Sequence, residues 1–178
     1  MGGEVYPLSF PKAPLRCLDL LTFLLVFRVT KEHPDLDCVF LNTGIQRGFN
    51  FSKPSTVSMS LLQTELATNY TLHIYLTHAF LPFLLRKQLS SLVYTTSGLA
   101  LVPLPRCPNY CASKAALHQF IISLRLHLKG TGVHVLEIIP PAAQTELHDE
   151  EVQPGLLSTP PLFAFSLVSP LDLIWRAK

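Results

Sequence analysis

An alternation of short apolar runs with amphipathic segments between residues 37 and 139 most constrains what this chain can fold into. The apolar runs begin at Asp37, Ser91 and Val133, and each ends at a glycine turn or a proline pair, which predicts buried strands. Helical periodicity predicts helices from about 57 to 86 and from 110 to 129. Strand, helix, strand, helix, strand predicts an α/β fold with a parallel sheet and right-handed crossovers.

The rest of the chain lacks this regularity. Residues 1–30 are expected to be an irregular leader with a partial helix, and residues 150–178 a divergent tail broken by prolines. Residues 31–149 therefore carry the predicted domain, and 178 residues are enough for one buried core. The positive mean hydropathy of +0.33 fits parallel strands buried on both faces.

Charge and cysteine patterns exclude several classes of function. A net charge of +2 without a cluster of basic residues gives no footprint for nucleic acid. The apolar stretch from Leu18 to Phe27 is too short to span a membrane. The four cysteines have no zinc-binding pattern and are expected to be free thiols, so we predict no metal and a cytoplasmic protein.

Tyr110 and Lys114 are spaced to lie on one face of a helix. A nearby cation stabilises phenolate and should lower the pKa of the phenol, which could then exchange a proton with a carbonyl or alcohol oxygen. Ser97 follows a predicted strand at its carboxyl end, where α/β sheets build their sites. The alternatives are a chance spacing for the Tyr–Lys pair and a simple turn residue for Ser97, beside Gly98.

The motifs, taken together and in order, resemble the short-chain dehydrogenase/reductase family. The resemblance covers roughly residues 31–149 and rests on Asn42-Thr43-Gly44, Asn69, Ser97, Tyr110-x-x-x-Lys114 and Pro140-Pro141-x-x-x-Thr145. It implies a Rossmann-like sheet with flanking helices, and an oxidoreductase that interconverts an alcohol and a carbonyl on a small molecule by hydride transfer.

The same resemblance implies the roles of the site residues. Tyr110 would be the acid–base, Ser97 would orient the substrate oxygen, and Lys114 would also bond the nicotinamide ribose. Asn69 would hold a water for proton relay, the alternative being a surface asparagine on a helix. The cofactor would be NAD or NADP, held by Asn42, Gly44, Tyr110, Lys114 and Thr145. Asp19 would hold it as well, from the end of a further strand that ends near residue 20.

One part of the family pattern is not found before Asn42, namely the glycine-rich Thr-Gly-x-x-x-Gly-x-Gly loop. We therefore expect an incomplete fold without its first βαβ portion, with residues 37–41 as an exposed edge strand. A homodimer through the helices at about 57–86 and 110–129 is expected from the family. Two functions stay open: an NAD(P)-dependent oxidoreductase, or a truncated, inactive remnant that dimerises or binds a partner.

Overall fold

The backbone is described for residues 5–7, 15–140 and 172–175 of a computed structural model, and side chains for residues 20–140. The central element is a parallel three-stranded sheet in the order β2 (Cys38–Leu41), β3 (Ser90–Thr95) and β4 (Val133–Ile138). Val39 is in register with Leu92, and Leu92 with Val135. The predicted α/β class and the three predicted strands are confirmed.

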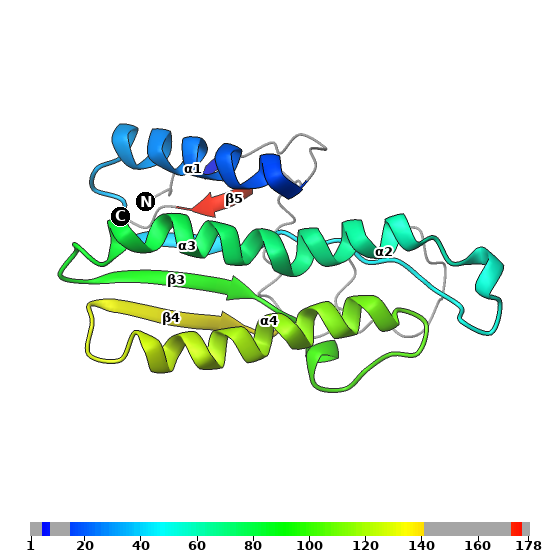
Figure 1. Cartoon of the computed structure of the whole chain (residues 1–178). Coiled ribbons are helices and arrows are strands. Elements are labelled where there is room, and N and C mark those ends of the chain that lie inside the picture. The colour runs from blue at the N-terminus through cyan, green and yellow to red at the C-terminus, as the bar shows by residue number, and fades with distance from the viewer. Residues whose placement is uncertain (1–4, 8–14, 141–171, 176–178) are drawn as a thin grey trace.

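Three long helical segments run side by side along the strands (Figure 1). They are α1 (Leu15–Glu32), the pair α2 (Met59–Leu66) and α3 (Leu72–Leu84), and α4 (Pro108–His127). Helix α1 packs against α3, and α4 packs against α2 and β4. The core between helices and sheet is formed by fully buried apolar side chains, among them Leu41, Leu76, Phe80, Leu92, Leu117 and Ile121.

The long helix predicted at about 57–86 is interrupted by one wider turn. Helices α2 and α3 are joined by η2 (Ala67–Thr71), a turn of π-helix that contains Asn69. Such turns add one residue to a helix and occur often at functional sites, because they change the direction of side chains. Ser58 caps the start of α2 by accepting a hydrogen bond from the backbone N–H of Leu61.

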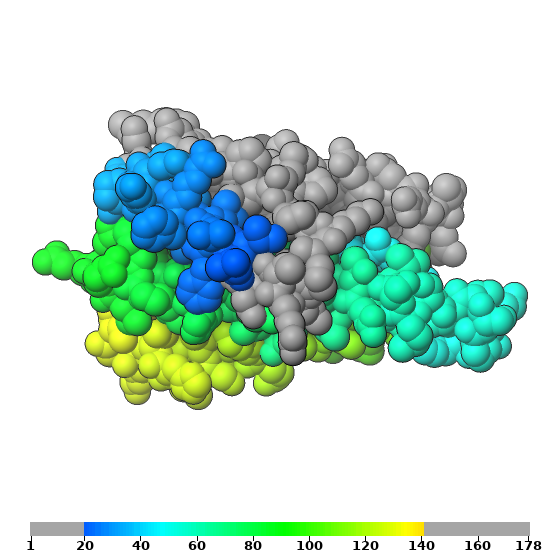
Figure 2. All heavy atoms as spheres, turned by 45° about the horizontal axis from the view of Figure 1, so that its top comes forward, coloured from blue at the N-terminus to red at the C-terminus, as the bar shows by residue number. Residues whose placement is uncertain are grey.

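The segment between β2 and α2 leaves the body of the molecule. It includes η1 (Pro54–Thr56), and it projects beyond the ends of the long helices (Figures 1 and 2). Residues 51–56 of this segment are all exposed. The part of the segment that precedes this projection, residues 42–49, lies beside the α2–η2 helix, where the backbone of Ile45 and Arg47 bonds to Asn69 and Glu65, and it is important for the site.

The partial helix expected within residues 1–30 is α1, which begins at Leu15, and a short strand, β1 (Val5–Pro7), pairs with β5 (Asp172–Trp175). Strand β2 is an edge strand of the three-stranded sheet. Strand β5 contacts β2 without joining its sheet, and the side chains of Val39 and Leu41 are fully buried.

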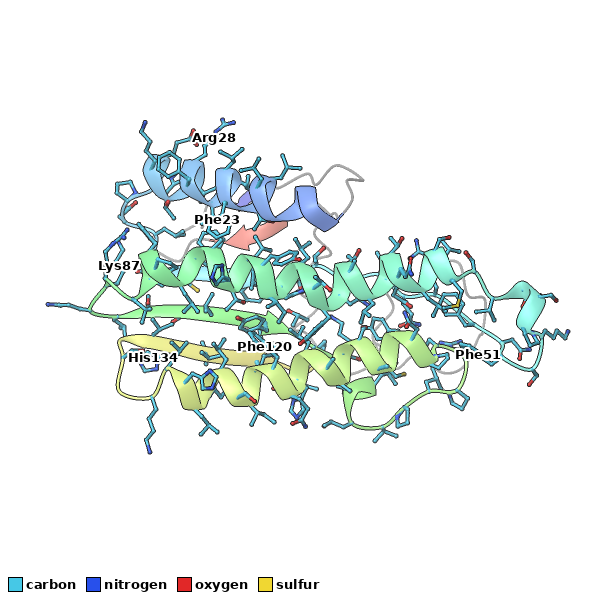
Figure 3. All side chains as sticks on the ribbon, viewed as in Figure 1. Phe23, Arg28, Phe51, Lys87, Phe120 and His134 are labelled. Atoms are coloured by element: carbon cyan, nitrogen blue, oxygen red, sulfur yellow. The ribbon has the colours of Figure 1, made fainter. Side chains whose placement is uncertain are left out.

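Helix α1 presents apolar side chains on both of its sides. Phe23 points from α1 toward α3 (Figure 3), where its ring meets His78 edge-on at 5.5 Å between centroids. Leu20, Leu24 and Phe27 are largely exposed, whereas Arg28 points away from the sheet and pairs with Glu32.

Candidate active site

Helix α4 places Tyr110 and Lys114 at the carboxyl ends of the strands. Pro108 occupies the first turn of the helix, where its missing N–H costs nothing. Both Tyr110 and Lys114 are buried, and the Lys114 Nζ lies 5.8 Å from the centroid of the Tyr110 ring. That ammonium donates a hydrogen bond to the carbonyl oxygen of Thr95, the last residue of β3, at 2.9 Å. Tyr110 and Lys114 therefore lie on one face of α4, as their spacing predicted, and this face is directed at the carboxyl end of β3.

Burial dominates the proton affinities of this pair. It lowers the pKa of Lys114 to about 8, because the charged ammonium loses its water. It raises the pKa of Tyr110 to about 12, against the opposing effect of the hydrogen bond with Ser97. The lowered phenol pKa expected from the neighbouring lysine is not found in this structure, because burial is the largest influence on the phenol and raises its pKa.

Ser97 follows β3 and precedes the short helix η3 (Gly98–Ala100). Its backbone is extended, and its hydroxyl oxygen accepts a hydrogen bond from the N–H of Leu99 at 3.1 Å. Ser97 also lies close enough to the phenol of Tyr110 to lower its pKa. Ser97 is therefore both a turn residue and a neighbour of the phenol, so the two interpretations of its role are compatible.

Asn69 is fully buried, which excludes a surface asparagine. Its side-chain oxygen accepts a hydrogen bond from the backbone N–H of Ile45, and its side-chain nitrogen donates one to the backbone carbonyl of Ile45, both at 2.8 Å. The amide also donates to the hydroxyl of Ser113 at 3.0 Å. Asn69 therefore ties the loop after β2 to α4, one residue away from Lys114.

The turn at Asn42-Thr43-Gly44 lies on the same side. A Cβ on Gly44 would be 3.3 Å from the Nζ of Lys114 and 3.6 Å from the Oδ1 of Asn69. A side chain at this position would crowd the lysine, so glycine keeps open the space beside its ammonium. Asn42 is exposed at the end of β2.

Two predicted cofactor residues are not brought to this site. Thr145 lies outside the described residues. Asp19 lies within α1 rather than at the end of a strand. Its expected position beside adenine is therefore not supported, because the apolar residues that follow it form a helix and not the end of a strand.

Two further buried polar residues lie beside the site and were not predicted. Glu65 is fully buried and accepts hydrogen bonds from the backbone N–H of Arg47 at 2.8 Å and the side-chain amide of Asn109 at 2.6 Å. The signal in the sequence was its position four residues before Asn69, on the buried face of a helix. His73, also fully buried, has its pKa lowered to about 3, mainly by burial and also by Lys114. It is therefore neutral at physiological pH.

Other kinds of site were searched for in the described parts of the chain. Residues 20–140 contain no group of histidine, cysteine and acidic side chains that could hold a metal ion. None of the described helices combines the length and the apolar character needed to cross a membrane.

Fold and site together define a Rossmann-like α/β domain with a serine, a tyrosine and a lysine at the carboxyl ends of its strands. Residues 23–154 match the short chain dehydrogenase family, and the chain belongs to that family.

Relatives of known sequence agree with this assignment. The chain is 38% identical over 120 residues to the uncharacterized oxidoreductase DltE of Bacillus subtilis, covering 67% of this chain and 47% of that protein. It is 35% identical over 112 residues to serine 3-dehydrogenase of Agrobacterium fabrum, covering 63% and 44% of the two chains. The chain thus spans about half the length of these relatives.

Solved structures share the fold. Aldohexose dehydrogenase of Thermoplasma acidophilum superimposes with a TM-score of 0.67 at 19% identity, over 72% of this chain and 49% of that one. A short chain dehydrogenase of Burkholderia cenocepacia, in complex with NADP, gives a TM-score of 0.64 at 24% identity, over 74% and 54%.

Proposed function

We propose that this chain is an NAD(P)-dependent oxidoreductase that interconverts an alcohol and a carbonyl, with Tyr110 as the acid–base. The observation that supports it best is the convergence of Ser97, Tyr110 and Lys114 from β3 and α4 on one buried cluster. Ser97 lies close enough to the phenol to lower its pKa, and the ammonium lies 5.8 Å from the centre of its ring. This is the arrangement that proton transfer to a substrate oxygen needs.

The residues beside Lys114 fit the nicotinamide end of such a cofactor. The absence of a side chain on Gly44 leaves room next to the ammonium, since a Cβ there would stand 3.3 Å from Nζ. Among the described residues the ammonium has one hydrogen-bond acceptor, Thr95, so donors remain for a ribose hydroxyl. Lys114 and Tyr110, with Asn42 and Thr145, are the residues that we propose hold the cofactor, whose chemistry is the donation or acceptance of hydride.

Tyr110 is suited to act first as an acid. With a pKa of about 12 its phenol is protonated at neutral pH and can donate that proton to a carbonyl oxygen. Ser97, beside the same phenol, would orient the substrate oxygen. The Lys114 ammonium would stabilise the phenolate that forms, and proton return through the Asn69 region would restore the phenol.

Titration of the purified chain with NADH and with NADPH, followed by nicotinamide fluorescence, tests this proposal. Saturable micromolar binding that is retained in Tyr110→Phe, with turnover lost in that variant, is the expected result. Normal turnover by Tyr110→Phe would refute the proton-transfer role. No binding of either nucleotide would instead support the alternative, an inactive protein that binds a partner.

We also propose that the chain forms a homodimer through α2, α3 and α4. Apolar side chains stand on the outer surface of these helices, with Leu126 71% and Met59 64% exposed. Such a surface is stabilised by a partner. Light scattering should give twice the monomer mass, and Leu126→Glu should halve it; a monomeric native chain would contradict the proposal.

A further inference from the structure

Glu65 and Lys114 are the two buried residues between 20 and 140 whose side chains are charged in water at neutral pH. The proposed chemistry uses the lysine and leaves the carboxylate unexplained. Burying a carboxylate without a partner costs several kcal/mol, so its surroundings need to be accounted for. Both of its oxygens are bonded, and the partners lie on two different segments of the site.

The contacts of Glu65 repeat those of Asn69 one helical turn away. We call the contacts of Asn69 with Ile45 and Ser113 the Asn69 bridge, and those of Glu65 with Arg47 and Asn109 the Glu65 bridge. Each bridge starts on the α2–η2 helix and joins the loop after β2 to α4. The bridged residues are four apart on both helices and two apart in the loop.

Tyr110 lies between the two bridges. Asn109 directly precedes it, and Ser113 donates a hydrogen bond from its hydroxyl to the Tyr110 carbonyl at 2.7 Å. Asn109 is held from a second side as well, because its amide also donates to the carbonyl of Leu62 at 3.2 Å. Contacts from α2 therefore fix the first turn of α4. The backbone N–H groups of this first turn have no hydrogen-bond partner within their own helix.

We infer that Glu65 is a positioning residue for Tyr110, holding the loop after β2 and the first turn of α4 together one helical turn away from the Asn69 bridge. This inference rests on the proposed acid–base function of Tyr110. Hydrogen bonds to a carboxylate are about twice as strong as those between neutral groups. A glutamate therefore ties the two segments more firmly than an uncharged side chain of the same size.

The carboxylate also acts on the phenol directly. Burial is the main cause of the raised pKa of Tyr110, and the negative charge of Glu65 adds a smaller effect in the same direction, while Ser97 opposes both. Burial raises the pKa of Glu65 itself, and the hydrogen bond from Asn109 and the contacts with Arg47 lower it.

The test replaces Glu65 in the full chain and follows the titration of Tyr110. Incorporating a fluorinated tyrosine, whose phenol is more acidic, brings the titration into an accessible pH range, and Tyr110→Phe assigns its ¹⁹F signal. In Glu65→Gln the midpoint should move to lower pH. In the exchange variant Glu65→Gln/Asn109→Asp the amide and the carboxylate change places, and the midpoint should return toward that of the native chain. Glu32→Gln, the same change on an exposed residue of α1, should leave it unmoved.

A second variant tests the contact itself. Glu65→Asp keeps the charge but is one methylene too short to reach both partners, so exchange of the Arg47 amide hydrogen should be about tenfold faster. The inference would be overturned by a Glu65→Gln midpoint equal to the native one, by an exchange variant without rescue, or by native amide exchange in Glu65→Asp. These measurements need neither nucleotide nor substrate, so they are independent of whether the proposed oxidoreductase activity is found.

Discussion

Lys114 should cost the folded chain stability at neutral pH, and its replacement by methionine should recover that stability. Burial lowers the pKa of this ammonium from 10.5 to about 8. The gap of about 2.5 pH units, at about 1.36 kcal/mol for each, corresponds to roughly 3 kcal/mol of unfolding free energy. Methionine has a similar length and no charge, so Lys114→Met removes this cost.

The sign follows from proton binding in the two states. Between pH 8 and 10.5 the unfolded chain keeps a proton on Lys114 that the folded chain has released, so the free energy of unfolding rises with pH. Below pH 8 both states are protonated and the full cost is present. The variant also loses the hydrogen bond to the Thr95 carbonyl, which is worth at least about 1.5 kcal/mol because the donor is charged. A net gain of up to about 1.5 kcal/mol at pH 7 is expected.

Urea unfolding of both chains at pH 7, 8, 9 and 9.5 measures this difference. The advantage of Lys114→Met should be largest at pH 7 and shrink as pH rises, because only the native chain recovers stability by deprotonating the lysine. Lys129→Met, at an exposed lysine, is the control and should leave the free energy of unfolding unchanged at every pH. The reasoning fails if the two unfolding free energies stay parallel across this range, or if Lys114→Met is the less stable chain at pH 7.

Two further substitutions test the packing that supports the site. Phe80→Ala should lower the free energy of unfolding by about 3–5 kcal/mol because its ring is fully buried. Phe51→Ala, at a ring that is 59% exposed, is the control and should change it little. Similar losses in the two variants would contradict the core assignment. Gly132→Ala should lower the free energy of unfolding by about 1–3 kcal/mol, because a Cβ at this position would collide with the backbone oxygen of Gln88. A urea midpoint equal to that of the native chain would show that this turn can move.

Local patterns were enough to predict the elements that carry the site. Apolar runs bounded by turns predicted β2, β3 and β4, because strands buried on both faces need little besides apolar side chains. The four-residue spacing placed Tyr110 and Lys114 on one face of α4. The position of Ser97 after β3 followed from the rule that parallel strands present their functional residues at their carboxyl ends.

Patterns in single segments failed where the outcome depends on a distant segment. Asp19 has the sequence context of a strand end, yet the apolar residues around it pack as helix α1 against α3. Glu65 resembles an ordinary helix-surface glutamate until Arg47 and Asn109, from two other segments, bond to its carboxylate. The number of water molecules that a side chain loses on folding cannot be seen in the spacing of residues.

The sequence by itself determined the α/β class, the parallel strands and the order of Asn69, Ser97, Tyr110 and Lys114 along the chain, because periodicity and short spacings are local properties. Only the tertiary structure decided the proton affinities and the second bridge. Burial, and not the neighbouring cation, governs the pKa of Tyr110. The two bridges exist because side chains of the α2–η2 helix contact both the loop after β2 and α4, and their hydrogen bonds join residues from 18 to 44 positions apart in sequence.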